Sequence, residues 1–320
     1  MGASDAFGTL IGIQGSVMGW DDPWHPPASA AIMRTGEGRI FPSQDGTPSV
    51  SQFVAYLRSL GAECYLHQVI PSTEMIDDFV RDCAGRGLPF LLGNEYGNIN
   101  GPFDASSNRY DIPDASVAAA ERTGGLLGLV YDETEHLQMH PDMYRKDARR
   151  HQWARVDGLS LQGSEDAVVQ AVQDRCRRFG GRVPLYSEQV FPVMFHALAR
   201  GGMSPCPKVL KEEFQSVQLA TALGAARQYG RGMGICVDLW GPDVGDWFHR
   251  VWGFPGHPPE EFKSALEMAW LMGPRVLFVE NVDVLARFTG ESFRATEFGD
   301  IFHEFTHRFV PEHPRPMDVK

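Results

Sequence analysis

Short apolar runs alternate with segments of helical periodicity along nearly the whole chain, and this alternation constrains the fold more than any other feature. The run Leu-Leu-Gly-Leu-Val-Tyr at 126–131 is typical of a strand buried on both faces, as strands of parallel sheets are. The segment 259–272 begins with Pro-Pro-Glu-Glu and ends at Gly273, which indicates a helix. We expect eight strands, each followed by a helical segment, at 9–16, 63–70, 89–94, 126–131, 183–187, 207–211, 234–239 and 275–279.

Eight strand-then-helix units that close on themselves form the (β/α)8 TIM barrel, which is the fold we expect for this α/β chain. An open doubly wound sheet would usually carry a glycine-rich phosphate turn after its first strand, and Gly12-Ile-Gln-Gly15 does not fit that motif. The composition shows no break that would indicate a second domain. We therefore expect one catalytic barrel over residues 1–310 and a C-terminal tail at 311–320.

The charge balance restricts the classes of partner. The chain has 29 Lys and Arg against 41 Asp and Glu, which gives a formal net charge of −12 and argues against binding to nucleic acid. No apolar run approaches the ~18 residues that a membrane-spanning helix needs, so we expect no membrane partner. The first residues lack the features of a signal peptide. A cytoplasmic protein, or a secreted one whose signal peptide has been removed, is the expectation; the sequence does not indicate an oligomeric state.

Carboxylates follow most of the expected strands. In a (β/α)8 barrel the active site lies where the strands run into the loops that precede the helices, and six of the eight strands bring an acidic residue to that rim. Acidic groups this close repel one another unless donors separate them, a metal binds them or one holds a proton. Such crowding can create one proton donor and one ionised base from the same residue type. The candidate catalytic residues are Asp132, Glu133, Glu213, Asp238 and Glu280.

Aromatic and amide side chains accompany these acids. Aromatic rings stack on the C–H faces of sugars, while carboxylates and amides bind sugar hydroxyls, so the mixture favours a carbohydrate substrate. The net acidity favours a neutral sugar. The candidate substrate-binding residues are Trp20, Trp24, Asn94, Glu95, Tyr96, Tyr131, Glu135, Glu188, Trp240 and Trp247.

With these features the chain resembles the (β/α)8-barrel glycoside hydrolases, which cleave the glycosidic bonds of oligo- and polysaccharides with a pair of carboxylates. In their large retaining group the proton donor is a Glu at the end of strand four, commonly after Asn, and the nucleophile ends strand seven. That resemblance implies Glu133 as donor, with Asp132 in place of the Asn, and Asp238 as nucleophile.

Two other groups of these barrels imply different roles. Leu129-Val-Tyr-Asp132 is similar to the strand-four motif of the α-galactosidase-like enzymes, which implies Asp132 as nucleophile and Glu212 or Glu213 as donor. The adjacent Asp132-Glu133 pair also fits the hexosaminidase-like enzymes, where the Glu donates and the Asp steadies an acetamide. Strand four is common to all three interpretations.

Two alternative functions remain open. A metal-dependent sugar isomerase or epimerase would gather acids and histidines at the same rim to hold divalent ions. A carbohydrate-binding barrel without catalysis would use the same aromatic rings. The chain has no H-E-x-x-H motif, and under the hydrolase interpretation we expect no cofactor and no metal.

Overall fold

The computed structural model describes ten stretches of the chain, and every structural statement below concerns them. They are residues 8–15, 48–69, 76–94, 112–139, 154–210, 215–239, 243–244, 247–248, 257–280 and 282–314.

Eight parallel strands close into a barrel in the order β1-β10-β7-β6-β5-β4-β3-β2, which confirms the predicted (β/α)8 fold. The ring closes where β1 pairs with both β2 and β10, and neighbours along the ring are otherwise consecutive barrel strands. The barrel strands are β1 (Leu10–Gln14), β2 (Cys64–Gln68), β3 (Phe90–Asn94), β4 (Leu126–Asp132), β5 (Leu185–Gln189), β6 (Ser204–Val209), β7 (Gly234–Asp238) and β10 (Val276–Glu280).

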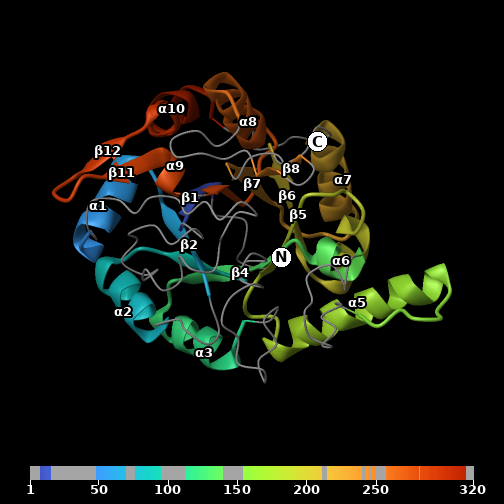
Figure 1. Ribbon diagram of the computed structural model, residues 1–320. Helices are drawn as coiled ribbons and strands as arrows, with labels where there is room; N and C mark the ends of the chain where they lie inside the picture. Colours follow the sequence, from blue (N-terminus) through green and yellow to red (C-terminus); the bar gives the residue numbers. More distant parts are fainter. Residues whose placement is uncertain are drawn as a thin grey trace.

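Helices form a ring outside the strands, as Figure 1 shows. Local signals in the sequence set several of their ends: Ser49 makes a reciprocal capping box with Gln52 at the start of α1, and left-handed Gly124 ends α3. The main helices are α1 (Val50–Ser59), α2 (Ile76–Arg86), α3 (Asp114–Thr123), α5 (Leu161–Arg178), α6 (Phe195–Gly201), α7 (Gln215–Gln228), α8 (Pro259–Leu271) and α10 (Glu297–Glu304).

Smaller elements interrupt the regular alternation and were not predicted. A short helix follows β4, and a helix and a hairpin separate β10 from α10. The last helix ends at Glu312, and the Trp270 indole donates a hydrogen bond of 2.9 Å to the carbonyl oxygen of His313. These elements are α4 (Thr134–Met139), β8 (Asp243–Val244), β9 (Trp247–Phe248), α9 (Val282–Leu285), β11 (Ala286–Phe288), β12 (Phe293–Ala295), the π-helical turn η3 (Phe305–Phe309) and α11 (Val310–Glu312).

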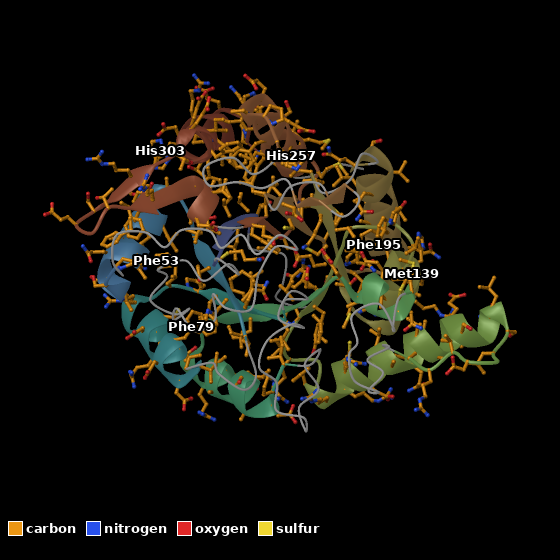
Figure 2. The ribbon with its side chains drawn as sticks, in the orientation of Figure 1. Phe53, Phe79, Met139, Phe195, His257 and His303 are labelled. Carbon is orange, nitrogen blue, oxygen red and sulfur yellow. The ribbon has the colours of Figure 1, made fainter. Side chains whose placement is uncertain are left out.

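Two apolar layers hold the barrel together. The larger lies between the strands and the helices and includes Phe53 on α1, Phe79 on α2 and Phe195 on α6, all fully buried (Figure 2). Burying one such ring contributes about 1.5–3 kcal/mol. The smaller layer comes from the barrel strands themselves, with members such as Val130 and Phe278. A filled barrel interior leaves its rim as the place for a site.

Within the described stretches, no helix combines the length and the apolar character needed to cross a bilayer.

Two helical glycines give a matched test of this packing. A Cβ at Gly299 in α10 would lie 2.1 Å from the carbonyl oxygen of Leu285, whereas a Cβ at the exposed Gly224 in α7 would meet nothing within 4 Å. We expect Gly299→Ala to lower the free energy of unfolding by about 1–3 kcal/mol through overpacking. Gly224→Ala should raise it by about 0.5–1 kcal/mol because alanine restricts the unfolded chain. Urea unfolding followed by circular dichroism measures both changes, and equal effects would contradict the close packing at Gly299.

Candidate active site

The alternation of side chains along each strand brings a layer of polar residues together at the carboxyl ends of the barrel strands. Residues two apart on a strand point to the same side. Val130, Tyr186, Cys206, Cys236 and Phe278 belong to the inner apolar layer. The residue two positions further on each of these strands is therefore also directed inward, and in each case it is charged or ionisable. These residues are Asp132, Glu188, Lys208, Asp238 and Glu280, all of them buried.

Lys208 lies at the centre of this layer and contacts five carboxyl groups from four other strands. Its Nζ lies 3.0 Å from Asp132 Oδ1, 3.2 Å from Glu133 Oε1 and 3.2 Å from Glu280 Oε2. The carboxyl oxygens of Asp238 and Glu188 are further away, at 3.7 and 3.9 Å. We call Asp132, Glu133, Glu188, Asp238 and Glu280 the carboxyl cluster. It brings together four of the five catalytic residues that the sequence predicted.

Glu133 joins the cluster because of its backbone. Asp132 and Glu133 are consecutive, so regular strand geometry would direct their side chains to opposite faces. Glu133 instead adopts a φ of 42°, in the left-handed region that non-glycine residues rarely occupy. This conformation turns its side chain back to the face of Asp132, and both carboxylates reach the same ammonium group. Backbone strain of this kind is concentrated at functional sites.

Burial and neighbouring charges shift the pKa values of Lys208 and of Glu188 beside it. Burial alone would lower the pKa of Lys208, but the attraction of Asp132, Glu280, Glu133 and Glu188 raises it well above its ordinary value, so Lys208 is an ammonium ion. Burial raises the pKa of Glu188 well above the ordinary range. Lys208 opposes that shift, whereas repulsion from Asp132 and Glu280 adds to it. Burial and the neighbouring carboxylates thus favour the protonated form of Glu188.

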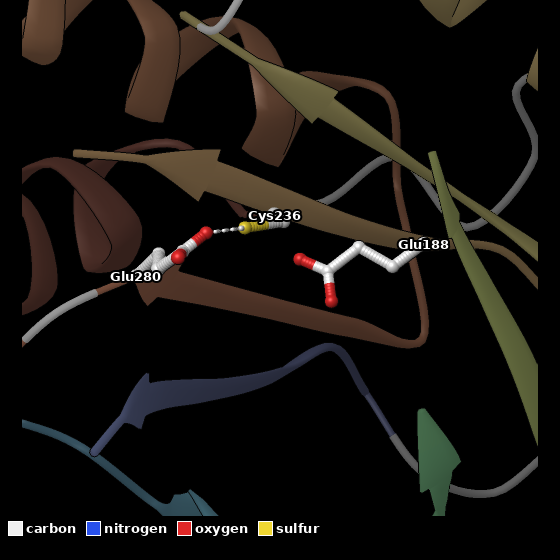
Figure 3. Close-up of side chains that lie close together, drawn as sticks. All are labelled: Glu188, Cys236 and Glu280. Carbon is white, nitrogen blue, oxygen red and sulfur yellow. Dashed lines mark hydrogen bonds between the residues drawn. The ribbon is translucent and has the colours of Figure 1, made fainter. Parts of the chain in front are cut away.

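Cys236 lies beside two members of the cluster (Figure 3). Its Sγ lies 3.8 Å from Glu280 Oε2, and ligand atoms of Glu188, Cys236 and Glu280 all lie within 4.8 Å of one another. Burial, with repulsion from Glu188 and Glu280, raises the pKa of the Cys236 thiol well above its ordinary value, so it remains protonated. These three residues could hold a cation only by competing with the Lys208 ammonium, which already contacts Glu280.

Two residues that we expected to bind substrate, Glu135 and Tyr131, lie apart from the carboxyl cluster and have structural contacts. Glu135 Oε1 accepts hydrogen bonds from the backbone N–H groups of Val190, at 2.6 Å, and Phe191, at 3.1 Å, and Oε2 accepts one from Gln189 Nε2. Glu135 thus anchors the segment that follows β5. Tyr131 lies in the apolar layer between strands and helices, because its position on β4 directs it away from Asp132. Their assignment to substrate binding stays a prediction.

Several predicted residues cannot be placed beside the cluster. The structure gives the backbone of Asn94 in β3 and of Trp247 in β9. The remaining candidates lie outside the described residues, namely Trp20, Trp24, Glu95, Tyr96, Glu213 and Trp240.

Lys208 was not among the predicted site residues, and the reason lies in the bounds of strand six. The strand was expected at 207–211, with its functional residues after Lys211, but β6 spans Ser204–Val209. With these bounds Lys208 lies inside the strand, two residues after Cys206 and on the same face. A lysine within an otherwise apolar run is rarely buried without an acidic partner. The presence of Lys208 in this run was therefore the sequence signal that could have indicated a buried ion pair.

Comparison with known proteins supports the fold. No protein-family model matches the chain, and no curated protein matches its sequence. A crystal structure of ScGas2 in complex with a compound aligns with a TM-score of 0.51 and 12% identity, over 98% of this chain and 67% of that one. A structure of Saccharomyces cerevisiae Gas2p with laminaritriose and laminaritetraose aligns with a TM-score of 0.46 and 12% identity, over 81% and 59%.

In several of these matches the chain spans about three fifths of the length of the solved protein. The alignment with a TM-score of 0.51 shows a similar fold.

Replacing Glu135 tests its anchoring role. Burial, with a smaller contribution from Glu133, raises its pKa to about 8. A raised pKa in the folded state means that the folded protein binds the proton of Glu135 more tightly than the unfolded chain does. The proton therefore adds to the free energy of unfolding. That contribution is complete below pH ~4 and is lost as the pH rises to about 8. We expect the stability difference between wild type and Glu135→Gln to shrink over that interval, by up to about 1.4 kcal/mol per pH unit. Chemical unfolding at several pH values measures it, and a constant difference would contradict the assignment.

Proposed function

We propose that this protein is a glycoside hydrolase, which cleaves a glycosidic bond with carboxyl groups of the cluster at the carboxyl ends of the barrel strands. The observation that carries the proposal is the convergence of five buried carboxyl groups on one ammonium group. Glycoside hydrolysis needs a protonated carboxylic acid at the leaving oxygen and a carboxylate that acts as nucleophile or activates water. A cluster in which burial favours a protonated Glu188, while the ammonium group favours ionised carboxylates beside it, meets that requirement.

The charge of the cluster favours a substrate rich in hydroxyl groups. One ammonium ion neutralises at most one of the carboxylates, and protonation of Glu188 removes the charge of another. The remaining carboxylate oxygens need hydrogen-bond donors, and sugar hydroxyls supply them in bidentate arrangements. The same negative charge repels uronic acids, so we propose a neutral sugar at the reacting position.

We place the β4 pair, Asp132 and Glu133, at the centre of the reaction. Glu133 is the most exposed member of the cluster, with a side chain 8% exposed against 0–2% for the others. Its left-handed backbone aims it into the cluster at the cost of local strain. All three groups of barrel hydrolases that the sequence resembles use this strand end.

Activity measurements on variants test the proposal. The purified protein is incubated with neutral oligo- and polysaccharides, laminari-oligosaccharides among them, and with aryl glycosides, and the released sugars are separated by chromatography. We expect Glu133→Gln and Asp132→Asn each to lower kcat/KM by roughly 10²-fold or more. Glu312→Gln, at an exposed carboxylate in α11, serves as the control and should retain full activity. Unchanged turnover in both β4 variants would exclude the strand-four site.

A metal measurement separates the hydrolase from a sugar isomerase. The Lys208 ammonium already contacts the carboxylates that would bind a divalent ion, so we expect activity to survive dialysis against EDTA. Elemental analysis of the purified protein should show no stoichiometric metal. One tightly bound divalent ion per chain, with loss of activity on chelation and recovery on its return, would favour the isomerase.

A further inference from the structure

The distances within the carboxyl cluster indicate a division of roles that neither the sequence nor the fold assigns. Lys208 Nζ lies within 3.2 Å of Asp132, Glu133 and Glu280, a distance typical of charge-assisted hydrogen bonds to ionised carboxylates. It lies 3.9 Å from Glu188, beyond hydrogen-bonding distance. Glu188 also lies beside the thiol of Cys236, which carries no positive charge. Glu188 is therefore the member of the cluster whose charge is least compensated.

We propose that Lys208 is a positioning residue that keeps the β4 pair ionised, and that Glu188 holds the proton that is delivered to the leaving group. The proposal rests on the proposed hydrolase function. It differs from the resemblance to the retaining barrels, which makes Glu133 the donor. Glu133 contacts the ammonium ion directly, and such contact favours its ionised form.

The surroundings of Glu188 agree with this assignment. Carboxylates of Asp132 on β4 and Glu280 on β10 repel negative charge on Glu188. Both neighbouring thiols, Cys236 on β7 and Cys206 on β6, have raised pKa values and contribute no positive charge. Among the described residues, Lys208 is the one cation that contacts the cluster. It lies closer to the other four carboxyl groups than to Glu188.

The reaction balances with water as the second reactant. Glu188 gives its carboxyl proton to the glycosidic oxygen as the bond to the anomeric carbon breaks, and the leaving sugar departs as an alcohol. A carboxylate of the β4 pair either bonds to the anomeric carbon, to be displaced later by water, or takes a proton from a water molecule that attacks directly. The proton of that water finally returns to Glu188, so one water is consumed for each bond cleaved.

Infrared spectroscopy tests the position of the proton without any substrate. At pH 7 the wild-type protein should show the carbonyl band of a buried, protonated carboxyl group in this cluster. The band should be absent in Glu188→Gln and present in the matched variant Glu133→Gln. Persistence of the band in Glu188→Gln, or its loss in Glu133→Gln alone, would overturn the proposal. Since burial raises the pKa of Glu135 to about 8, its carboxyl group would contribute a similar band, and the comparison is made in a Glu135→Gln background.

Leaving-group dependence tests the catalytic role of Glu188. A donor matters most when the leaving group is a poor one, so Glu188→Gln should lower kcat by roughly 10²–10⁴-fold on a natural oligosaccharide. On an aryl glycoside with an acidic phenol the loss should be at least tenfold smaller. Glu133→Gln should lose activity on both substrates alike. An equal loss on both substrates in Glu188→Gln would exclude it as donor.

The role of Lys208 is tested by removing its charge. Lys208→Met should move the acidic limb of the kcat/KM profile to higher pH, because Asp132 and Glu133 then ionise less readily, and it should lower kcat more than it raises KM. Lys208→Arg keeps the charge and should restore the wild-type limb at least in part. An unshifted limb in a folded Lys208→Met protein would overturn the positioning role. If that variant does not fold, the infrared comparison of Glu188→Gln with Glu133→Gln still decides where the proton lies.

The two proposals can fail separately. If no glycoside is turned over but the infrared band follows Glu188, the hydrolase proposal fails and the proton assignment stands. If glycosides are hydrolysed but the band and the leaving-group dependence do not follow Glu188, the division of roles fails and the hydrolase remains.

Discussion

The attraction between one buried ammonium group and the carboxylates around it determines how the polar side chains are arranged at the carboxyl ends of the barrel strands. Removing one partner of a buried ion pair typically costs about 3–5 kcal/mol, because the other charge is left in a poorly solvating environment. In this protein five carboxyl groups from β4, β5, β7 and β10 share the single charge of Lys208 on β6. The cluster thus ties five strands together, and burial and the neighbouring carboxylates favour the protonated form of Glu188 within it.

The barrel makes such an arrangement possible. Parallel strands in a closed ring present all their carboxyl ends at one mouth, and the alternation of side chains selects which residue of each strand lies inside. Apolar residues such as Val130 and Phe278 fill the interior below. The polar layer therefore rests on packed side chains, which fix its geometry and keep bulk water from screening its charges.

The left-handed conformation of Glu133 shows how local strain and the site depend on each other. Two consecutive carboxylates can contact one lysine only if the chain leaves regular strand geometry between them. The contact with Lys208 and the backbone hydrogen bond of 2.8 Å from Glu133 N–H to the Glu188 carbonyl oxygen hold that conformation in place. Strain and charge pairing are thus concentrated on the same residue.

The sequence by itself determined the repeated strand-then-helix order, the closed eight-stranded barrel that it implies and the gathering of acids at one rim. These features follow from local periodicity, from helix caps and from the positions of acids at strand ends. The tertiary structure alone decided which of them converge. It placed Lys208 among the acids and brought Glu133 to the side of Asp132. The physical reason is that the exact strand bounds and the single backbone dihedral of Glu133 set the direction of these side chains, and neither can be read from residue types alone.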